Sequence, residues 1–249
     1  MLLSPLRYIN PISGNRGGGS AAFSIAKSFY LDGVDECFTI PQADLSTYLS
    51  GSGKSFTINI LVKPFLGSVD YLFANNDFSF AIRVDASNKL QLICRDGGFN
   101  SSLSSDTLTD GVWQLLTLTY NSSLTLGNRA QMYIDSTILT KSNDILGSNI
   151  DSPTLDYQIG AKNSVAGLYG YINSFSVLDI ALSQSQITEL YNNGKPKNPQ
   201  SLFGANCKFF FNPDNSGDTA QFSVVDSVNS ITATSVNMED ADKTTETPY

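Results

Sequence analysis

The sequence predicts an all-β fold, an antiparallel two-sheet sandwich of the jelly-roll type. Three observations support this prediction. Apolar and polar residues alternate in short runs, clusters of Gly, Asn, Asp and Ser separate the runs, and a single segment has helical periodicity. Alternation with a period of two places successive side chains on opposite faces of a strand. Short strands joined by turn-forming residues are typical of antiparallel sandwiches.

The predicted strands occupy much of the segment from residue 56 to residue 134. The run at 112–120 is the richest in apolar residues, as expected of a central strand. In the other runs one face is apolar and the other is polar, so one face of each strand enters the core. The apolar positions of these runs are Phe56, Ile58, Ile60 and Val62, then Phe78, Phe80, Ile82 and Val84, then Leu90, Leu92 and Cys94, then Met132 and Ile134.

One short helix is predicted, near residues 183–193. Ser183 and Gln186 have the spacing of a capping box, in which each residue satisfies a backbone N–H at the helix start. Gly194 is placed to end the helix in a left-handed conformation. The helix has a single apolar face, formed by Ile187, Leu190 and Tyr191.

Composition and charge exclude several classes of function. The chain has 249 residues, enough for one large β domain or two small ones, and its 23 acidic and 15 basic residues give a net charge of −8. The five arginines lie far apart in the sequence, so nucleic acid is not an expected partner. No apolar stretch approaches 18 residues, so membrane insertion is not expected. The N-terminal segment lacks the pattern of a signal peptide, which predicts synthesis in the cytoplasm followed by assembly or by release through other means.

The residues that most hydrolases need are scarce in this chain. There is no histidine and there are only four glutamates. Hydrolysis of glycosides uses two suitably spaced carboxyl groups, whereas Asp35 and Glu36 are adjacent and would point to opposite faces of a strand. We therefore predict no catalytic residues and no enzyme activity. Purified protein is expected to show no heat-labile hydrolysis on a panel of glucans.

The cysteines give no sign of a metal site or a disulfide framework. Cys37, Cys94 and Cys207 are odd in number and widely separated, so at least one thiol is free within the chain. Cys94 lies on the apolar side of its run, which predicts a buried structural thiol. Zinc sites that use histidine are excluded by composition. No metal and no cofactor are predicted.

Aromatic residues are the candidates for sugar contacts, although the sequence does not identify a ligand-binding site. Trp113 lies in an apolar run and is interpreted first as a core residue, with a sugar-stacking platform as the alternative. Phe99, Tyr157 and Tyr169 lie in predicted loops and are better placed to meet a glycan.

Five sequence blocks follow one another between residues 28 and 194, and the predicted helix follows the last of them. The blocks are SFYLDGVDECF at 28–38, FTINILVKP at 56–64, GVW with LTY at 111–120, MYID at 132–135, and GYIN through ALS at 170–183. In this order they resemble the laminin-G-like branch of the concanavalin A-like lectin/glucanase superfamily. The resemblance implies a concanavalin A-like jelly roll and carbohydrate binding.

The chain departs from that family's pattern at several positions. Gln114 and Leu115 stand where the family has paired histidines, and Asn173 stands where it has an aspartate. The Glu-x-Asp-x-Glu catalytic strand of glucanase relatives is absent. Many relatives bind calcium, and Asp32 and Asp35 lie in a matching block. These two residues are open to two interpretations, part of a calcium site or side-chain caps of a turn, and the turn is favoured.

The C-terminal block gives the resemblance a more specific direction. Residues 209–238 resemble a segment that precedes the first block in many laminin-G-like proteins, but here it follows the helix. This order resembles laminin-G-like proteins of bacteriophage virions. It implies a non-enzymatic virion structural protein, either capsid decoration or a tail-associated fibre or spike, that uses the sandwich for assembly and adhesion to host-surface glycans. The alternative is a free carbohydrate-binding lectin or adhesin.

The chain is predicted to consist of an N-terminal assembly arm and one sandwich domain. The arm, residues 1–24, is too short to build its own core and ends in a flexible Gly-rich joint. The sandwich, residues 25–249, includes a C-terminal part, residues 203–249, that supplies completing strands and an acidic tail. The expected partners are other virion proteins, bound through the arm, and a host-surface glycan. By resemblance a homo-oligomer is expected, commonly a trimer, located in the virion.

Overall fold

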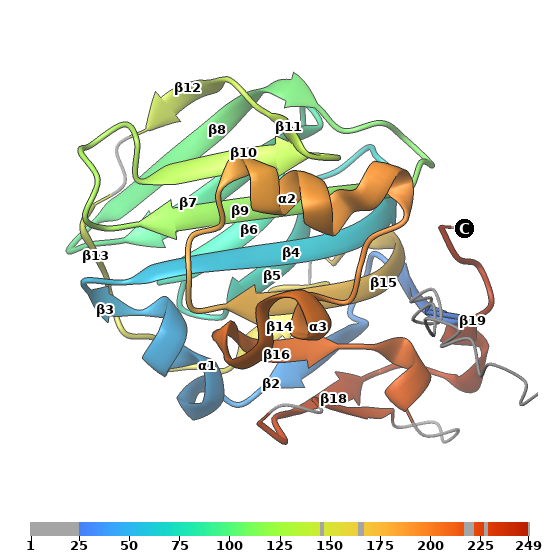
Figure 1. The fold of residues 1–249 in the computed structure, drawn as a ribbon. Coiled ribbons are helices and arrows are strands. Elements are labelled where there is room, and N and C mark those ends of the chain that lie inside the picture. Colours follow the sequence, from blue (N-terminus) through green and yellow to red (C-terminus); the bar gives the residue numbers. More distant parts are fainter. Residues whose placement is uncertain (1–24, 145–146, 164–166, 217–221, 227–228, 249) are drawn as a thin grey trace, which may run out of the picture.

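Two large antiparallel sheets packed face to face form the fold, which confirms the predicted sandwich (Figure 1). The computed structural model describes residues 25–144, 147–163, 167–216, 222–226 and 229–248. The hydrophobic core lies between the two sheets, and the short helices lie outside the sheets.

The first sheet has eight strands, in the order β11-β10-β9-β4-β15-β1-β19, with β16 pairing the second half of β15. Its centre is the long antiparallel pair β4 and β15, which runs from Thr57 opposite Leu178 to Pro64 opposite Gly170, with a register shift between Ile172 and Ser174. The strands are β11 (Thr137–Ile138), β10 (Ala130–Ile134), β9 (Gln114–Asn121), β4 (Ser55–Pro64), β15 (Tyr169–Leu178), β1 (Ser28–Asp32), β19 (Lys243–Thr244) and β16 (Cys207–Phe211).

The second sheet has nine strands, in the order β12-β8-β7-β6-β5-β14-β2-β18-β17. A separate two-stranded ladder joins β3 (Gly51–Ser52) to β13 (Asn149–Ile150). The strands of the second sheet are β12 (Lys141–Asp144), β8 (Phe99–Thr107), β7 (Lys89–Arg95), β6 (Phe80–Val84), β5 (Asp70–Asn75), β14 (Tyr157–Ile159), β2 (Cys37–Ile40), β18 (Thr232–Val236) and β17 (Ser223–Val225).

The inner faces of both sheets meet in one aromatic and aliphatic core. The apolar positions of β4, β6 and β7 point into it, as the alternating pattern predicts. Phe73 and Phe175 bring the two sheets together, with ring centroids 4.7 Å apart. Complete burial of one such side chain stabilises a fold by about 1.5–3 kcal/mol. Cys94 lies in this core, and all three cysteines are buried and outside any disulfide.

The C-terminal strands are integral to both sheets. In the first sheet β16 pairs with β15 and β19 pairs with β1, and in the second sheet β18 pairs with β2. The ring centroids of Phe211 and Phe222 lie 6.0 Å and 5.1 Å from that of Phe29. The division between arm and sandwich stays a prediction, because residues 1–24 lie outside the described residues.

The predicted helix is present as α2 (Gln184–Tyr191) and lies over the outer face of the first sheet (Figure 1). The capping box forms: Gln186 Oε1 accepts a hydrogen bond from the Ser183 N–H at 2.9 Å. Asn192 ends the helix in the left-handed region, with φ 47°, so the expectation that Gly194 provides this cap is wrong. Asparagine adopts the left-handed conformation more readily than most residues, so the helix can end at Asn192, two residues before Gly194.

Two further helices escaped the sequence analysis, α1 (Gln42–Leu49) and α3 (Pro199–Phe203). Both are too short to show periodicity, and α1 buries only Leu45 and Leu49. Asn198 caps α3 by accepting a hydrogen bond from the Gln200 N–H at 2.8 Å. Single 3₁₀ turns are η1 (Asn192–Gly194), η2 (Gly204–Asn206), η3 (Pro213–Asn215) and η4 (Asp240–Asp242). Within the described part of the chain, no helix is long and apolar enough to cross a bilayer.

Glu36, at the edge of β2, is a nearly buried acid whose titration affects stability. Its Oε2 atom accepts a hydrogen bond from the Asp32 N–H at 2.5 Å. Burial raises the pKa of Glu36 to about 7, and the charges of Asp242 and Asp32 act in the same direction. The folded protein therefore retains this proton up to about pH 7, whereas the ordinary pKa is 4.5. Stability from this group is present below pH 4.5 and is lost as the pH rises to 7.

We expect Glu36→Gln to raise the thermal midpoint by a few degrees at pH 8 and to change it little at pH 4. Glutamine keeps the shape and the acceptor of the protonated acid but cannot ionise. Thermal unfolding followed by circular dichroism at both pH values measures the difference. An equal shift at pH 4 and pH 8 would show that ionisation of Glu36 has no part in the effect.

Candidate functional site

A shallow hollow of about 290 Å³ lies on the outer face of the nine-stranded sheet, over β6, β7 and β8. Strand pairing brings its residues together: Arg83 is opposite Gln91, and Ile93 is opposite Ser101. These residues alternate with core residues, so they point away from the sandwich. We call this hollow the outer-face pocket. Its lining residues are Phe78, Arg83, Gln91, Ile93, Asn100 and Ser101.

Phe78 provides the aromatic wall of the outer-face pocket. The sequence pattern predicts that Phe78 shares the inner face with Phe80, and this prediction is wrong. Phe78 lies in the turn between β5 and β6 at φ 62° and packs with Tyr71 on the outer surface, with ring centroids 5.9 Å apart. A bulky residue in the left-handed region is unusual and persists only where its surroundings hold it.

Asp77 supplies the restraint on this turn. Its Oδ1 atom accepts hydrogen bonds from the N–H of Ser79 at 3.0 Å and from the Ser79 hydroxyl at 2.8 Å. Its Oδ2 atom accepts from the N–H and the hydroxyl of Thr154, at 2.6 Å and 2.8 Å. Burial alone would raise the pKa of Asp77, but the hydrogen bonds from Thr154 and Ser79 outweigh it and lower the pKa. The carboxylate thus joins the turn to a segment 77 residues away.

Arg83 is held in place by neutral neighbours. Its Nε–H donates to Gln91 Oε1 at 2.7 Å, and Nη1 donates to the Tyr71 hydroxyl at 3.1 Å. The guanidinium carbon lies 5.6 Å from the centroid of the Tyr71 ring. Two hydrogen bonds and a ring face therefore fix the position of this cation before any ligand arrives.

Lys162 brings a second cation to the same surface from the segment between β14 and β15. Its Nζ atom lies 3.6 Å from the centroid of the Phe78 ring and 6.0 Å from that of Tyr71. Burial lowers the pKa of Lys162. An isolated parallel bridge between Tyr71 and Gly167 fixes this segment beside β5.

The outer-face pocket combines an apolar ring with amide, hydroxyl and cationic groups. Ligand pockets commonly have this composition, an apolar lining with a few well-placed polar groups. The amides of Gln91 and Asn100 and the hydroxyl of Ser101 are donors and acceptors suited to sugar hydroxyls. None of the six lining residues carries a carboxyl group. The arrangement can bind a polar ligand against a ring but offers no acid–base pair for hydrolysis.

A second group of aromatic side chains lies on the outer face of the eight-stranded sheet. We call it the tyrosine cluster; it comprises Tyr30, Phe65, Trp113, Tyr169 and Tyr171. Tyr169, predicted as a glycan candidate, is 44% exposed. Trp113 is partly buried and packs beside the apolar residues under α2, so it does not belong to the main core.

A lysine also lies within the tyrosine cluster. Lys63 Nζ is 5.6 Å from the centroid of the Tyr171 ring and forms an ion pair with Glu246 Oε1 at 2.9 Å. This ion pair and the attached hydrogen bond lower the pKa of Glu246. The C-terminal segment therefore supplies the counter-charge here.

The other residues that the sequence suggests as glycan or calcium ligands lie in strands or in the turn between β1 and β2. The prediction that Tyr157 is a loop residue available to a glycan is wrong. Tyr157 lies in β14, is 1% exposed and stacks on Phe73, with ring centroids 5.3 Å apart. Phe99 begins β8, and its side chain lies outside the described part. Asp32 Oδ1 accepts a hydrogen bond from the Val34 N–H at 2.8 Å, and Asp35 Oδ2 accepts from the Asn237 amide at 3.0 Å. Asp32 thus acts as a side-chain cap of the turn, whereas Asp35 links the turn to Asn237 in the C-terminal part of the chain.

No group of three or more Cys, Asp or Glu side chains is placed to hold a metal ion within the described ranges. The prediction that the chain has no metal site rests on the sequence.

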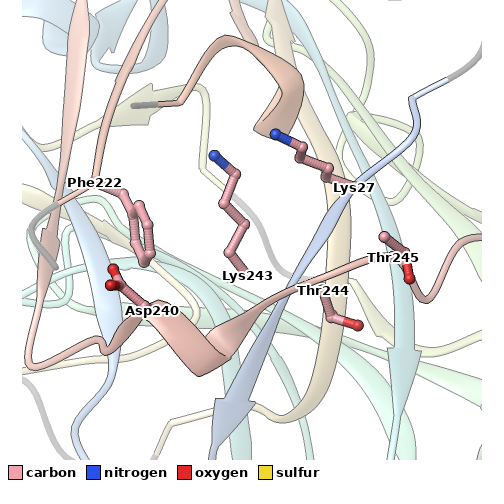
Figure 2. Close-up of a pocket in the computed structure, with 6 residues that line it drawn as sticks. All are labelled: Lys27, Phe222, Asp240, Lys243, Thr244 and Thr245. Atoms are coloured by element: carbon pink, nitrogen blue, oxygen red, sulfur yellow. The ribbon is translucent and has the colours of Figure 1, made fainter. Parts of the chain in front are cut away.

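A further pocket of about 330 Å³ lies near the C-terminal end of the chain (Figure 2). The ammonium groups of Lys27 and Lys243 point to the same side of it, and Phe222 lies beside Lys243. Lys243 Nζ donates a hydrogen bond to the Ser216 carbonyl at 3.1 Å. The other lining residues are Asp240, Thr244 and Thr245. Lys27 and Phe222 closely follow in sequence the segments 1–24 and 217–221, which lie outside the described residues.

Comparison with solved structures shows that another protein shares this fold. A Bacteroides ovatus protein described as a candidate carbohydrate-binding protein matches with a TM-score of 0.61 and 14% identity, over 87% of this chain and 59% of that one. The chain thus spans less than two thirds of the length of that relative. The CBM40 of the Ruminococcus gnavus IT-sialidase, bound to α2,3-sialyllactose, matches at TM-score 0.49 and 11% identity, over 67% and 98% of the two chains.

A heptameric SAP-like pentraxin from Limulus polyphemus matches at TM-score 0.47 and 15% identity, over 68% of this chain and 84% of that one. No curated protein sequence matches the chain. The family model of the concanavalin A-like lectin/glucanases superfamily matches residues 30–188, which include the central strands of both sheets and the start of α2. The chain is therefore a member of the concanavalin A-like lectin/glucanase superfamily, with a lectin-like sandwich fold.

Proposed function

We propose that the sandwich is a non-catalytic glycan-binding module and that the outer-face pocket is its binding site. The observation that carries this proposal is the position of Phe78. The Asp77 carboxylate holds this residue in an unfavourable backbone conformation that turns its ring out of the core and into the wall of a polar hollow. Backbone strain of this kind concentrates at ligand-binding sites.

The chemistry of the outer-face pocket supports a sugar as the ligand. A sugar ring has an apolar C–H face, which packs on an aromatic ring, and a rim of hydroxyl groups that need donors and acceptors. Phe78 and Ile93 supply the apolar surface, and the amides of Gln91 and Asn100 supply both hydrogen-bond types. The resemblance in fold to a candidate carbohydrate-binding protein supports the same proposal.

The proposal that the module is not an enzyme rests on the lack of carboxyl groups among the residues that line the outer-face pocket. Glycoside hydrolysis needs two of them on either side of the scissile bond, about 5–9.5 Å apart. The lining residues of the outer-face pocket include none. Its lining groups can hold a sugar, but they do not include the pair of carboxyl groups that glycoside hydrolysis uses.

We expect Phe78→Ala to weaken glycan binding by about tenfold or more, because the ring face of the site is lost. A glycan microarray identifies the bound sugars, and titration calorimetry then gives Kd for both proteins. Tyr169→Ala is the matched control, since it removes an exposed aromatic ring from the tyrosine cluster and should leave Kd unchanged. Equal Kd values for wild type and Phe78→Ala, or the absence of any bound glycan, would contradict the proposed function.

A second proposal concerns where the module works. The resemblance of the C-terminal block to laminin-G-like proteins of bacteriophage virions supports a place in a virion, as capsid decoration or as a tail-associated fibre or spike. The arm, residues 1–24, would then bind other virion proteins. Mass spectrometry of purified particles tests this proposal, and a chain found only as a free soluble protein would favour the lectin or adhesin alternative. Native mass spectrometry measures whether the chain forms a homo-oligomer.

A further inference from the structure

We propose that the outer-face pocket selects glycans with an acidic sugar unit, whose carboxylate or sulfate group binds between Arg83 and Lys162. This inference rests on the proposed function and adds the class of ligand to it.

The first argument is the position of the two cations. Arg83 lies on β6 and Lys162 lies beyond β14, yet each is within 6.0 Å of the centroid of the Tyr71 ring. The whole chain has a net charge of −8. Two cations beside a single ring therefore form a local basic site on an acidic protein, and such a site attracts an anionic ligand more strongly than the net charge suggests.

The second argument is that, among the residues that the structure describes, neither cation is paired with a carboxylate. In the part of the chain that the structure describes, the partners of Arg83 are the Gln91 amide and the Tyr71 hydroxyl, which are neutral. In the same part, the Lys162 ammonium lies over two uncharged rings, at 3.6 Å from the centroid of Phe78 and 6.0 Å from that of Tyr71, and no ion pair of Lys162 is present. Partial burial lowers the pKa of Lys162, so the ammonium gains more from an anion than a fully solvated group would.

The third argument is an internal comparison with the tyrosine cluster. Lys63 also lies over an aromatic ring, at 5.6 Å from the Tyr171 centroid, but there Glu246 pairs with it at 2.9 Å. A lysine over an aromatic ring is thus paired with a carboxylate at one face of the sandwich, whereas at the other face the described residues provide no carboxylate partner for the lysine. An acidic ligand would supply at Lys162 the carboxylate that Glu246 supplies at Lys63.

The fourth argument is preorganisation. Arg83 donates one hydrogen bond from Nε to Gln91 and one from Nη1 to the Tyr71 hydroxyl, and these two bonds fix the plane of the guanidinium. A guanidinium held in this way loses little further freedom when it binds an oxyanion, and its planar edge matches carboxylate and sulfate groups. A neutral glycan gains nothing from this arrangement, so it should bind less tightly.

The test uses pairs of glycans that share a backbone and differ in their acidic groups. Tetragalacturonate is compared with its methyl ester, and a chondroitin sulfate tetrasaccharide with its desulfated form. The wild-type full-length chain should bind at least one acidic member about tenfold more tightly than its uncharged or less charged partner, as measured by titration calorimetry. The two pairs distinguish a carboxylate from a sulfate as the preferred anion. Raising NaCl from about 50 mM to about 500 mM should weaken this binding several-fold.

Variants connect the selectivity to the two cations. Lys162→Met and Arg83→Met should each lower affinity for the acidic glycan about tenfold, while Lys162→Arg keeps it within about threefold because the charge is retained. Lys63→Met, which removes the lysine that already has a partner, is the control and should leave affinity unchanged. Thermal unfolding of each variant verifies that the fold is intact.

Two outcomes separate this inference from the proposed function. If neutral glycans bind as tightly as acidic ones and Phe78→Ala abolishes binding, the glycan site stands and the acidic selectivity is overturned. Wild-type affinity in Lys162→Met and Arg83→Met would overturn it equally. If no glycan of any charge binds, the proposed function fails, and the inference fails with it.

Discussion

Removal of residues 203–249 is expected to unfold the domain or to make it aggregate. This segment contributes β16, β17, β18 and β19, which pair with strands of both sheets. It also contributes Phe209, Phe211 and Phe222, each at most 1% exposed. Loss of a buried phenylalanine side chain costs about 3–5 kcal/mol. Three such losses are comparable to the whole free energy of unfolding of a typical domain, about 5–15 kcal/mol.

The control for this truncation is removal of residues 1–20, which should leave a folded and soluble protein. Thermal unfolding by calorimetry compares both truncated chains with the full chain. A cooperative transition of the C-terminal truncation at the wild-type temperature would show that residues 203–249 are an independent appendage. In particles, the N-terminal truncation is expected to fail to incorporate, since the arm is the predicted assembly contact.

Asp77→Ala is expected to lower the free energy of unfolding by about 1–3 kcal/mol and to abolish most glycan binding. The substitution removes the acceptor of four hydrogen bonds from Ser79 and Thr154. The turn then loses its tie to Thr154, and Phe78 is free to leave its left-handed conformation. Chemical denaturation measures the stability, and titration calorimetry measures the affinity.

A matched control separates the two effects of Asp77→Ala. Asp110 also ties a loop through its carboxylate, which accepts a hydrogen bond from the Leu66 N–H at 2.7 Å, but this loop lies beside the tyrosine cluster. Asp110→Ala should lower stability and leave glycan affinity unchanged. If Asp77→Ala retains wild-type affinity while it loses stability, the turn does not position Phe78 for binding.

Patterns among neighbouring residues predict the long strands and α2, because these elements depend on residues close together in the sequence. Period-two alternation identified the long strands, because the inner face of each strand must be apolar along its whole length. The spacing of Ser183 and Gln186 identified α2, because a capping box is satisfied within one turn. The ordered blocks between residues 28 and 194 identified the superfamily, which the family model over residues 30–188 confirms. Short elements such as α1 and β14 have too few residues for a pattern.

Phe78 and Tyr157 show where local patterns mislead. Alternation placed Phe78 on the inner face, but the residue sits in a turn whose geometry depends on Thr154. The sequence predicts a loop at Tyr157, but this residue lies in the three-residue strand β14, which pairs with a strand on each side and buries the ring. In both cases the decisive partner is distant in the sequence, so no window of neighbouring residues contains the information.

The fold class, the superfamily and the scarcity of hydrolytic side chains follow from the order and types of the residues along the chain. The outer-face pocket, in contrast, exists only because strands distant in the sequence lie side by side. Arginines far apart in the sequence gave no sign of a basic site, yet pairing of β5 with β6 and the course of the chain after β14 place Arg83 and Lys162 beside one tyrosine ring. Sheet register sets which outward-facing residues are neighbours, and register depends on contacts between distant strands rather than on the residues of any one strand.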